Sequence, residues 1–251
     1  MVAVGGDSGT GKAALCAGLR DVFGSERCGE LHLDGYFALD RAQRNAVGMT
    51  PLDPRTHDFA LMDEDLWQLA HGAAVTVPVY DHLRGAVAGS RAVEPRDIML
   101  VQGRFPLYTH VLRALFDVGV WLEREREFTL PWTIHREIGG AAGERRRADY
   151  ATYLAPQARH ADVHVRFTRA GVTLSERGRP PLEVDAAIDA QQAGALEDTI
   201  RSGPQPERLG AYAAGDGEQT SAPLAIAQLL VARRIDQVAH QRAEAEAEAA
   251  S

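Results

Sequence analysis

A glycine-rich loop near the N-terminus carries the first chemistry of this sequence. Gly6 and Gly11 stand five positions apart, and Lys12 follows the second glycine. Successive backbone N–H groups in such a loop point at a polyphosphate, and the N-terminus of the following helix adds a favourable dipole. The lysine would reach the terminal phosphates. We therefore predict a nucleotide-binding loop made of Gly6, Asp7, Ser8, Gly9, Thr10, Gly11 and Lys12.

The residue after the loop lysine departs from the usual pattern. A Ser or Thr at this position supplies a hydroxyl ligand to magnesium, whereas this chain has Ala13. The loop amides and the lysine remain in place. The sequence therefore predicts that a nucleotide binds with an unusually weak requirement for magnesium.

Short apolar runs indicate the strands that position this loop. We expect strands over 2–4, 31–33, 98–101, 118–122 and 163–167, with helix-forming stretches between them. Such alternation is typical of an α/β fold, with a mostly parallel sheet flanked by helices as in P-loop nucleotide-binding proteins. Ligands of these sheets bind at the carboxyl ends of the strands. The side chains expected there are Asp34 and Gln102.

The chain divides by composition into three regions. Residues 1–170 form the expected P-loop core. Gly and Pro interrupt residues 171–222 without a clear period, so we expect an irregular appended segment there. An apolar stripe that includes Leu224, Ala227 and Ile235 then predicts a helix. Residues 223–251 combine this short C-terminal helical extension with an acidic, low-complexity tail.

Composition narrows the class of protein. Of 251 residues, 45% are hydrophobic and 25% are charged, which is typical of a globular chain rather than a disordered one. The formal net charge of -8 argues against a general nucleic-acid-binding surface. Two cysteines are too few for a disulfide framework, and no stretch approaches the ~20 apolar residues of a membrane span. We therefore expect a cytoplasmic protein that binds neither nucleic acid nor membrane.

Nine short stretches share their order with one known protein family. They are residues 7–12, 31–36, 39–41, 50–55, 78–82, 106–108, 132–136, 153–157 and 160–163. Together they resemble the phosphoribulokinase and uridine kinase family of P-loop kinases, in particular its plant and cyanobacterial type. The resemblance covers about residues 2–168 and resumes near residue 215.

This resemblance implies an enzyme that transfers the terminal phosphoryl group of ATP to a sugar phosphate such as ribulose 5-phosphate. On the residues that match, Asp34 would accept the proton of the reacting hydroxyl, and Lys12 would contact the transferred phosphates. The resemblance implies a further catalytic role for Arg136, on a helix below a lid. The residues that it places on the substrate are Arg41, Tyr80 and His82.

Several positions depart from the family pattern. Ala13 and Gln102 replace a hydroxyl and an acidic residue that support magnesium, so we assign no metal ligand. Two histidines of the family are phenylalanines here, Phe37 and Phe105. Around the lid, changes at Thr133 and Glu137 accompany a basic segment that looks shortened to residues 139–143. The arginines at 145–147 either replace part of the lost lid charge or form a solvated face.

Three functions therefore remain open. The first is a divergent sugar-phosphate kinase, with ATP, weakly held magnesium and a sugar phosphate as its ligands. The second is a catalytically impaired homologue that binds a nucleotide or sugar phosphate and regulates a partner. The third is a repurposed enzyme that acts on another phosphorylated metabolite or on a nucleoside. Each of them is compatible with a homodimer.

Overall fold

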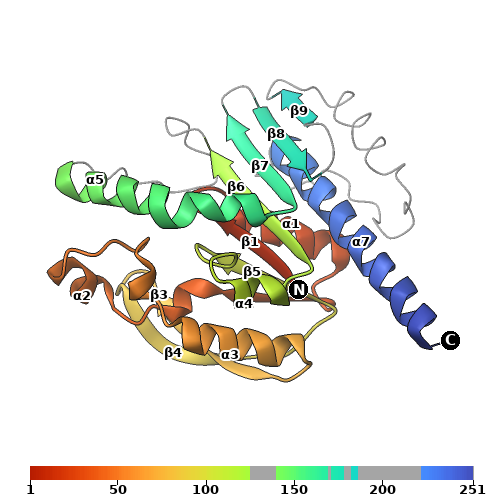
Figure 1. The fold of residues 1–251 in the computed structure, drawn as a ribbon, viewed down its shortest axis with the longest axis horizontal. Helices are drawn as coiled ribbons and strands as arrows, with labels where there is room; N and C mark the ends of the chain where they lie inside the picture. The colour runs from red at the N-terminus through yellow and green to blue at the C-terminus, as the bar shows by residue number, and fades with distance from the viewer. Residues whose placement is uncertain (125–139, 169–170, 178–181, 186–221, 251) are drawn as a thin grey trace.

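A central sheet of seven strands organises the molecule (Figure 1). The computed structural model describes residues 1–124, 140–168, 171–177, 182–185 and 222–250. The strand order is β2-β5-β1-β6-β7-β8-β9, in which the first five strands are parallel and the last two antiparallel. Their bounds are β1 Val2–Gly6, β2 Cys28–His32, β5 Ile98–Gly103, β6 Val118–Arg124, β7 Val163–Thr168, β8 Gly171–Glu176 and β9 Leu182–Asp185. The expected mostly parallel α/β fold is confirmed.

Helices connect and cover these strands. The α-helices are α1 Lys12–Phe23, α2 Arg41–Ala46, α3 Phe59–Ala70, α4 His110–Leu115, α5 Gly140–Asp149 and α7 Ala222–Ala250. Short helical turns occupy Leu33–Tyr36, Pro54–Thr56, Tyr150–Leu154 and Ala155–His160. A separate antiparallel hairpin pairs β3 Val75–Asp81 with β4 Ala86–Val93.

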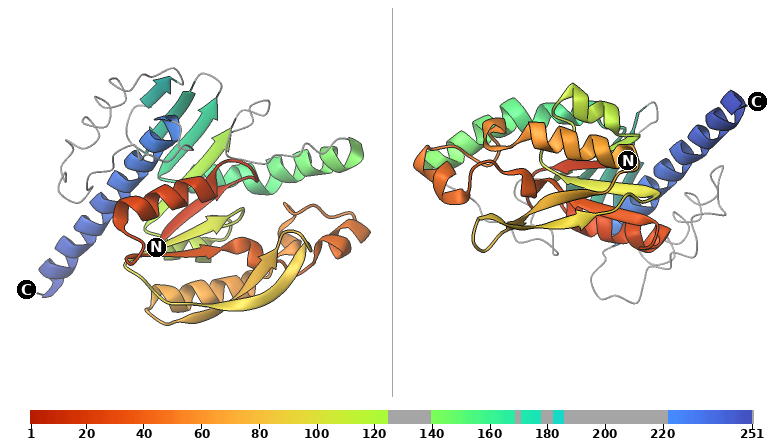
Figure 2. Two further views of the ribbon diagram at one scale, coloured as in Figure 1. Left: turned by 180° about the vertical axis from the view of Figure 1, so that it is seen from behind. Right: turned by 90° about the horizontal axis from the view of Figure 1, so that it is seen from below.

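Alternate side chains of the buried strands pack against helices on opposite faces of the sheet. On β5, Ile98 and Leu100 join the core under α1 and α7, whereas Met99 and Val101 join the core under α3 and α4. Figure 2, which views the molecule from behind, shows α1 and α7 side by side on that face of the sheet. Figure 1 shows α3 in front of the β3–β4 hairpin. Helix α7 is fixed by the side-chain amide of Gln228, which donates to the backbone carbonyl of Ala14 at 2.9 Å.

The structure differs from the sequence-based expectations in four places. Strand β2 ends at His32, so Leu33 and Asp34 lie in a 3-10 turn rather than in the strand. The appended segment is not irregular at 171–176 and 182–185, because β8 and β9 extend the sheet there. Residues 140–143, expected in a shortened lid, form the first turn of α5. The β3–β4 hairpin was not expected at all.

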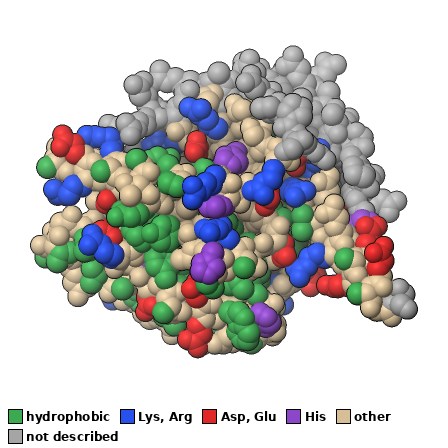
Figure 3. Space-filling view, in the orientation of Figure 1, with side chains coloured by type: hydrophobic (Ala, Val, Ile, Leu, Met, Phe, Trp, Pro, Cys, Tyr) green, Lys and Arg blue, Asp and Glu red, His purple; other side chains and the backbone are tan. Residues whose placement is uncertain are grey.

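One face of this acidic chain is locally basic. Figure 3 shows Arg, Lys and His side chains gathered in the middle of the view. Among the described residues, burial lowers the pKa of His160, and the charges of Arg113, Arg159 and Arg177 add to this shift. The net charge therefore does not describe every face of the molecule. Among the described helices, none is both long and apolar enough to cross a bilayer.

Candidate active site

The glycine-rich loop joins β1 to α1 at the carboxyl end of the sheet. Gly9 and Gly11 adopt left-handed φ angles of 76° and 91°, which residues with a Cβ rarely adopt. Asp7 holds the loop from within: its carboxylate accepts the Ser8 backbone N–H at 2.7 Å, and its carbonyl accepts the Thr10 hydroxyl at 2.9 Å. The predicted strand, loop and helix therefore form a phosphate-loop geometry.

Lys12 is the only lysine in the sequence, and its ammonium group folds back over the loop. Its Nζ donates to the backbone carbonyls of Gly6 at 2.9 Å and Asp7 at 2.7 Å. Burial, with the nearby charge of Arg104, lowers the pKa of Lys12 to about 8. This cation therefore lacks full compensation in the protein alone, which favours an anionic ligand.

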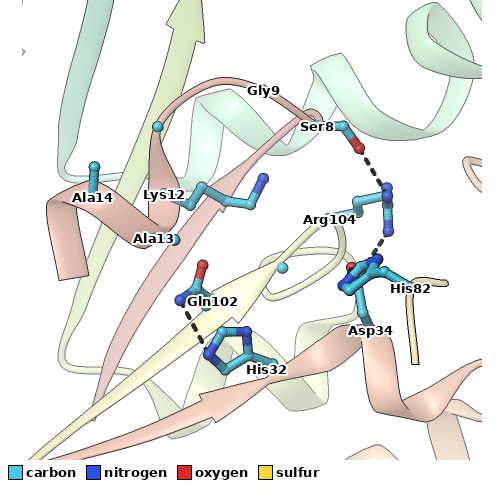
Figure 4. Close-up of a pocket in the computed structure, with 12 residues that line it drawn as sticks. Ser8, Gly9, Lys12, Ala13, Ala14, His32, Asp34, His82, Gln102 and Arg104 are labelled. Carbon is cyan, nitrogen blue, oxygen red and sulfur yellow. Dashed lines mark hydrogen bonds and ion pairs between the residues drawn. The ribbon is translucent and has the colours of Figure 1, made fainter. Parts of the chain in front are cut away.

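A cavity of about 440 Å³ opens beside the loop (Figure 4). It brings together the loop, the start of α1, the end of β2 and the end of β5, as expected for ligands of a parallel sheet. The lining residues are Ser8, Gly9, Gly11, Lys12, Ala13, Ala14, His32, Asp34, His82, Gln102, Gly103 and Arg104. Lys12, Asp34 and His82, which sequence reasoning placed in the site, therefore share one cavity.

Asp34 is held by two basic side chains. Arg104 Nη1 donates to Asp34 Oδ1 at 2.5 Å, and the His82 Nε2 atom lies 3.8 Å from Asp34 Oδ2. Burial alone would raise the pKa of this carboxyl, but Arg104, Lys12 and His82 outweigh it and lower the pKa. The carboxylate is therefore ionised and faces the cavity, as a general base requires.

Arg104 also connects this carboxylate to the phosphate loop. Its Nη2 donates to Ser8 Oγ at 2.8 Å, so one guanidinium bridges the loop and Asp34 (Figure 4). Sequence reasoning missed Arg104, although it stands two residues after Gln102 at the expected end of a strand. Its partners are 70 and 96 positions away, so no local pattern indicates the contact.

Gln102 lies opposite the start of α1, where an acidic residue would support a metal. Its Nε2 donates to the Glu30 carboxylate and lies 3.4 Å from His32 Nε2, which in turn lies 2.9 Å from Glu30 Oε1. Burial raises the pKa of Glu30, but hydrogen bonds from His32 and Gln102 prevail and lower it. Within the described residues, no three His, Cys, Asp or Glu side chains are grouped as a metal site.

The predicted substrate residues lie around the β3–β4 turn. Arg41 donates through Nη2 to the His82 carbonyl at 2.7 Å, and the Tyr80 hydroxyl accepts from Arg44 Nη2 at 3.1 Å. Arg41 and Tyr80 do not line the cavity, whereas His82 does. The predicted catalytic Arg136 and the changes at 132–137 fall in 125–139, outside the described residues.

An aromatic cluster fills the space beside Asp34. The His57 ring packs 4.3 Å from Phe37 and 4.8 Å from Phe105 between ring centroids, and Arg44 lies 4.0 Å over Phe37. Burial, with the charge of Arg104, lowers the pKa of His57 to about 3, so this ring is neutral at physiological pH. The two phenylalanines that replace family histidines therefore belong to one apolar packing unit.

One of the three arginines at 145–147 reaches the loop. Arg146 Nη2 pairs with Asp7 Oδ1 at 2.6 Å, and its side chain is only 18% exposed. Arg146 is therefore not part of a fully solvated face, while the replacement of lid charge by these arginines stays a prediction. The contact ties α5 to the phosphate loop.

Comparisons with known proteins bear on this site. Residues 1–173 match the model of the Phosphoribulokinase / Uridine kinase family. The chain is 36% identical over 172 residues to phosphoribulokinase of Synechocystis sp., with 65% of this chain and 52% of that protein covered. It is 30% identical over 189 residues to chloroplastic phosphoribulokinase of Spinacia oleracea, with 65% and 47% covered. The chain therefore spans about half the length of these relatives.

Two further similarities show the range of the match. Uridine kinase of Lactococcus lactis is 24% identical over 177 residues, covering 65% of this chain and 85% of that protein. The solved structure of phosphoribulokinase from Rhodobacter spheroides superposes with a TM-score of 0.63 at 12% identity, covering 96% of this chain and 97% of that one. At that identity the superposition supports the fold alone.

Proposed function

Since this chain belongs to the phosphoribulokinase and uridine kinase family, we propose that it is an ATP-dependent phosphotransferase. Its proposed reaction moves the terminal phosphoryl group of ATP onto a hydroxyl of a sugar phosphate such as ribulose 5-phosphate. A single observation carries this proposal: the loop lysine Lys12 and the carboxylate Asp34 face the same cavity. Phosphoryl transfer needs its phosphate cradle and its base on two sides of one space.

The proposed roles follow from the contacts. The loop amides and Lys12 hold the phosphates, and Asp34 accepts the proton of the attacking hydroxyl. His82, 71% exposed and beside Asp34, offers a hydrogen bond to the acceptor. Arg41 stands behind His82 and is proposed to bind the acceptor phosphate, because a guanidinium forms paired bonds to phosphate oxygens.

The donor set does not fit a magnesium ion held in the usual way. Ala13 has no side-chain oxygen, Gln102 is a neutral amide whose nitrogen is bonded to Glu30, and one oxygen of Asp34 accepts from Arg104. Magnesium prefers anionic oxygen ligands in octahedral geometry. We therefore propose that this chain holds the metal weakly, and no step above is assigned to it.

The test is phosphoryl transfer from radiolabelled ATP, with ribulose 5-phosphate and uridine offered separately as acceptors. We expect transfer to ribulose 5-phosphate, and a loss of about 10²–10⁴-fold in turnover for Asp34→Asn, since the amide cannot accept the proton. ATP affinity should be unchanged in that variant. Asp97→Asn, which changes an exposed carboxylate paired with Arg27, is the matched control. Equal turnover in Asp34→Asn and the control would refute the assignment of the base.

One observation favours a second candidate, a catalytically impaired homologue that binds the same ligands and regulates a partner. The carboxylate proposed as base is already occupied by Arg104, and its lowered pKa makes it a weaker proton acceptor. The same assay separates the two. Binding of ATP and ribulose 5-phosphate by calorimetry, without transfer above background, would favour this second function. Preferential transfer to uridine would instead favour a repurposed nucleoside kinase.

A further inference from the structure

We propose that Arg104 is a built-in replacement for the divalent metal: a fixed cation that binds the terminal phosphates, so that polyphosphate binding needs no metal ion. This inference rests on the proposed nucleotide site and adds a residue that the family resemblance did not indicate.

The first support is the position of the guanidinium. Arg104 follows β5 directly, lines the cavity with Ser8 and Lys12, and has a side chain only 12% exposed. A phosphate cradled by the loop amides lies beside Ser8 and therefore meets the group that bonds the Ser8 hydroxyl. Arg104 is thus placed where charge on the phosphates must be neutralised.

The second support is the unused hydrogen-bonding capacity of this side chain. A guanidinium carries five N–H donors. Arg104 donates one from Nη1 to Asp34 and one from Nη2 to Ser8, while its buried Nε has no hydrogen-bond partner among the described residues. The second N–H of Nη1 and the second N–H of Nη2 therefore remain for an oxygen-rich ligand in the cavity, whereas the buried Nε is not exposed to one.

The third support is the charge balance of the cavity. Its lining holds two strong cations, Lys12 and Arg104, against one carboxylate, Asp34. Lys12 itself bonds two backbone carbonyls, Gly6 and Asp7, which carry no full charge. The lowered pKa of Lys12, caused by burial and then by Arg104, agrees with this excess of positive charge. A polyphosphate, and not a further cation, is the ligand that neutralises it.

The fourth support is the loss of metal-binding oxygens at the same place. Ala13 and Gln102 supply no anionic oxygen, and one of the two carboxylate oxygens of Asp34 already accepts a hydrogen bond from Arg104. A permanent cation thus stands where two metal supports are missing. Arginine suits this task because it stays charged at any physiological pH and matches phosphate geometry with paired donors.

The test is calorimetric titration of the full chain with ATP and with inorganic tripolyphosphate, each in excess EDTA and again in excess magnesium. We expect the wild-type protein to bind both ligands in EDTA. Arg104→Met should weaken this metal-free binding about 10- to 100-fold, the scale of a hydrogen-bonded charge pair. Arg104→Lys should lose less, because it keeps the charge and gives up only the planar fork.

Two further variants keep the test interpretable. Arg27→Met removes an exposed arginine paired with Asp97, at the opposite end of β2, and should bind like the wild type. Because Arg104→Met leaves Asp34 buried without its partner, Asp34→Asn/Arg104→Met removes both charges together and should show the same weakening. Thermal melting checks that each variant is folded.

The outcomes separate the two proposals. The role of Arg104 would be overturned, and the kinase proposal left intact, if Arg104→Met or the folded double variant bound tripolyphosphate in EDTA as tightly as the wild type does. The role of Arg104 would also be overturned if the wild type bound ATP only in the presence of magnesium. A wild-type chain that binds ATP under neither condition would refute the proposed function itself, and this inference with it.

Discussion

Replacing Lys12 with methionine should stabilise the protein while removing its affinity for nucleotides. In the folded protein the pKa of Lys12 is lowered from 10.5 to about 8, chiefly by burial. One pKa unit corresponds to 1.36 kcal/mol, so holding this charge in the folded state costs about 3 kcal/mol at pH 7. Methionine removes that cost and keeps most of the side-chain volume.

The expected net gain is smaller than this cost. Lys12→Met also gives up two hydrogen bonds, to the carbonyls of Gly6 and Asp7. At about 0.5–1.5 kcal/mol each, they reduce the gain to about 1–2 kcal/mol. For a chain of this size, that gain raises the melting temperature by roughly 3–6 °C.

The pH dependence gives this prediction a specific signature. Below pH 8, Lys12 is charged in both the folded and the unfolded protein, so the full cost is present. Between pH 8 and 10.5 the folded protein releases this proton while the unfolded chain still holds it, and wild-type stability rises relative to the variant. The advantage of Lys12→Met should therefore be largest at pH 7, fall to zero between pH 8 and 10.5, and reverse near pH 10.5, where only the loss of the two hydrogen bonds remains.

Denaturant unfolding from pH 7 to 10.5 measures this difference directly. Because Lys12 is the only lysine, NMR of ¹⁵N-lysine-labelled protein also reports its pKa from a single side-chain signal. Arg27→Met is the control, since an exposed arginine stays charged over this range and should give no pH-dependent difference. A variant less stable than the wild type at pH 7, or an advantage constant with pH, would refute the reasoning.

Three other predictions concern the ligands. ATP affinity in EDTA should fall as pH rises through about 8, because Lys12 loses its charge, and calorimetry in buffers of different ionisation heat should detect proton uptake on binding at that pH. Ala13→Ser with Gln102→Glu should make ATP binding more dependent on magnesium, since both changes return oxygen ligands; an unchanged ratio of affinities with and without magnesium would contradict this. Arg41→Ala should weaken ribulose 5-phosphate binding by about 2 kcal/mol and leave ATP binding unaltered, whereas Asp34→Asn should leave both affinities nearly intact.

The parts of the site that the sequence predicted are encoded locally. Glycine spacing determines the loop from Gly6 to Lys12, because residues with a Cβ rarely adopt the left-handed angles found at Gly9 and Gly11. Apolar runs likewise predict most of the parallel strands. The β3–β4 hairpin also had a local signal, namely β-branched residues at 75–77 and Gly85 with a φ of 73° in its turn.

The remaining features depend on contacts between distant parts of the chain. His32 and Gln102 lie side by side only because β2 pairs with β5 in that register, which no pattern within either strand specifies. The Arg104–Asp34 bond likewise requires the sheet order β2-β5-β1. The packing of Phe37 on His57 depends on an isolated bridge between these two residues. A single sequence indicates such residues as candidates but not as partners.

The Arg104–Asp34 pair decides between weak and absent catalysis. A carboxylate of lowered pKa is a poorer base, and this would cripple a reaction that depends on early removal of a proton. Phosphoryl transfer passes through a loose transition state in most accounts, so the charge on the phosphates and the position of the acceptor matter more than the strength of the base.

Arg104 weakens Asp34 as a base but fixes its orientation and adds a cation beside the phosphate loop. The weaker base slows proton removal, whereas the added cation stabilises the charge on the phosphates. Because charge on the phosphates matters more in this reaction, the net effect of Arg104 should favour turnover. Arg104→Met should therefore lower phosphoryl transfer from ATP relative to the wild type in the same assay, even though it frees the carboxylate of Asp34. A rise in transfer would show instead that the Arg104–Asp34 pair inhibits the enzyme.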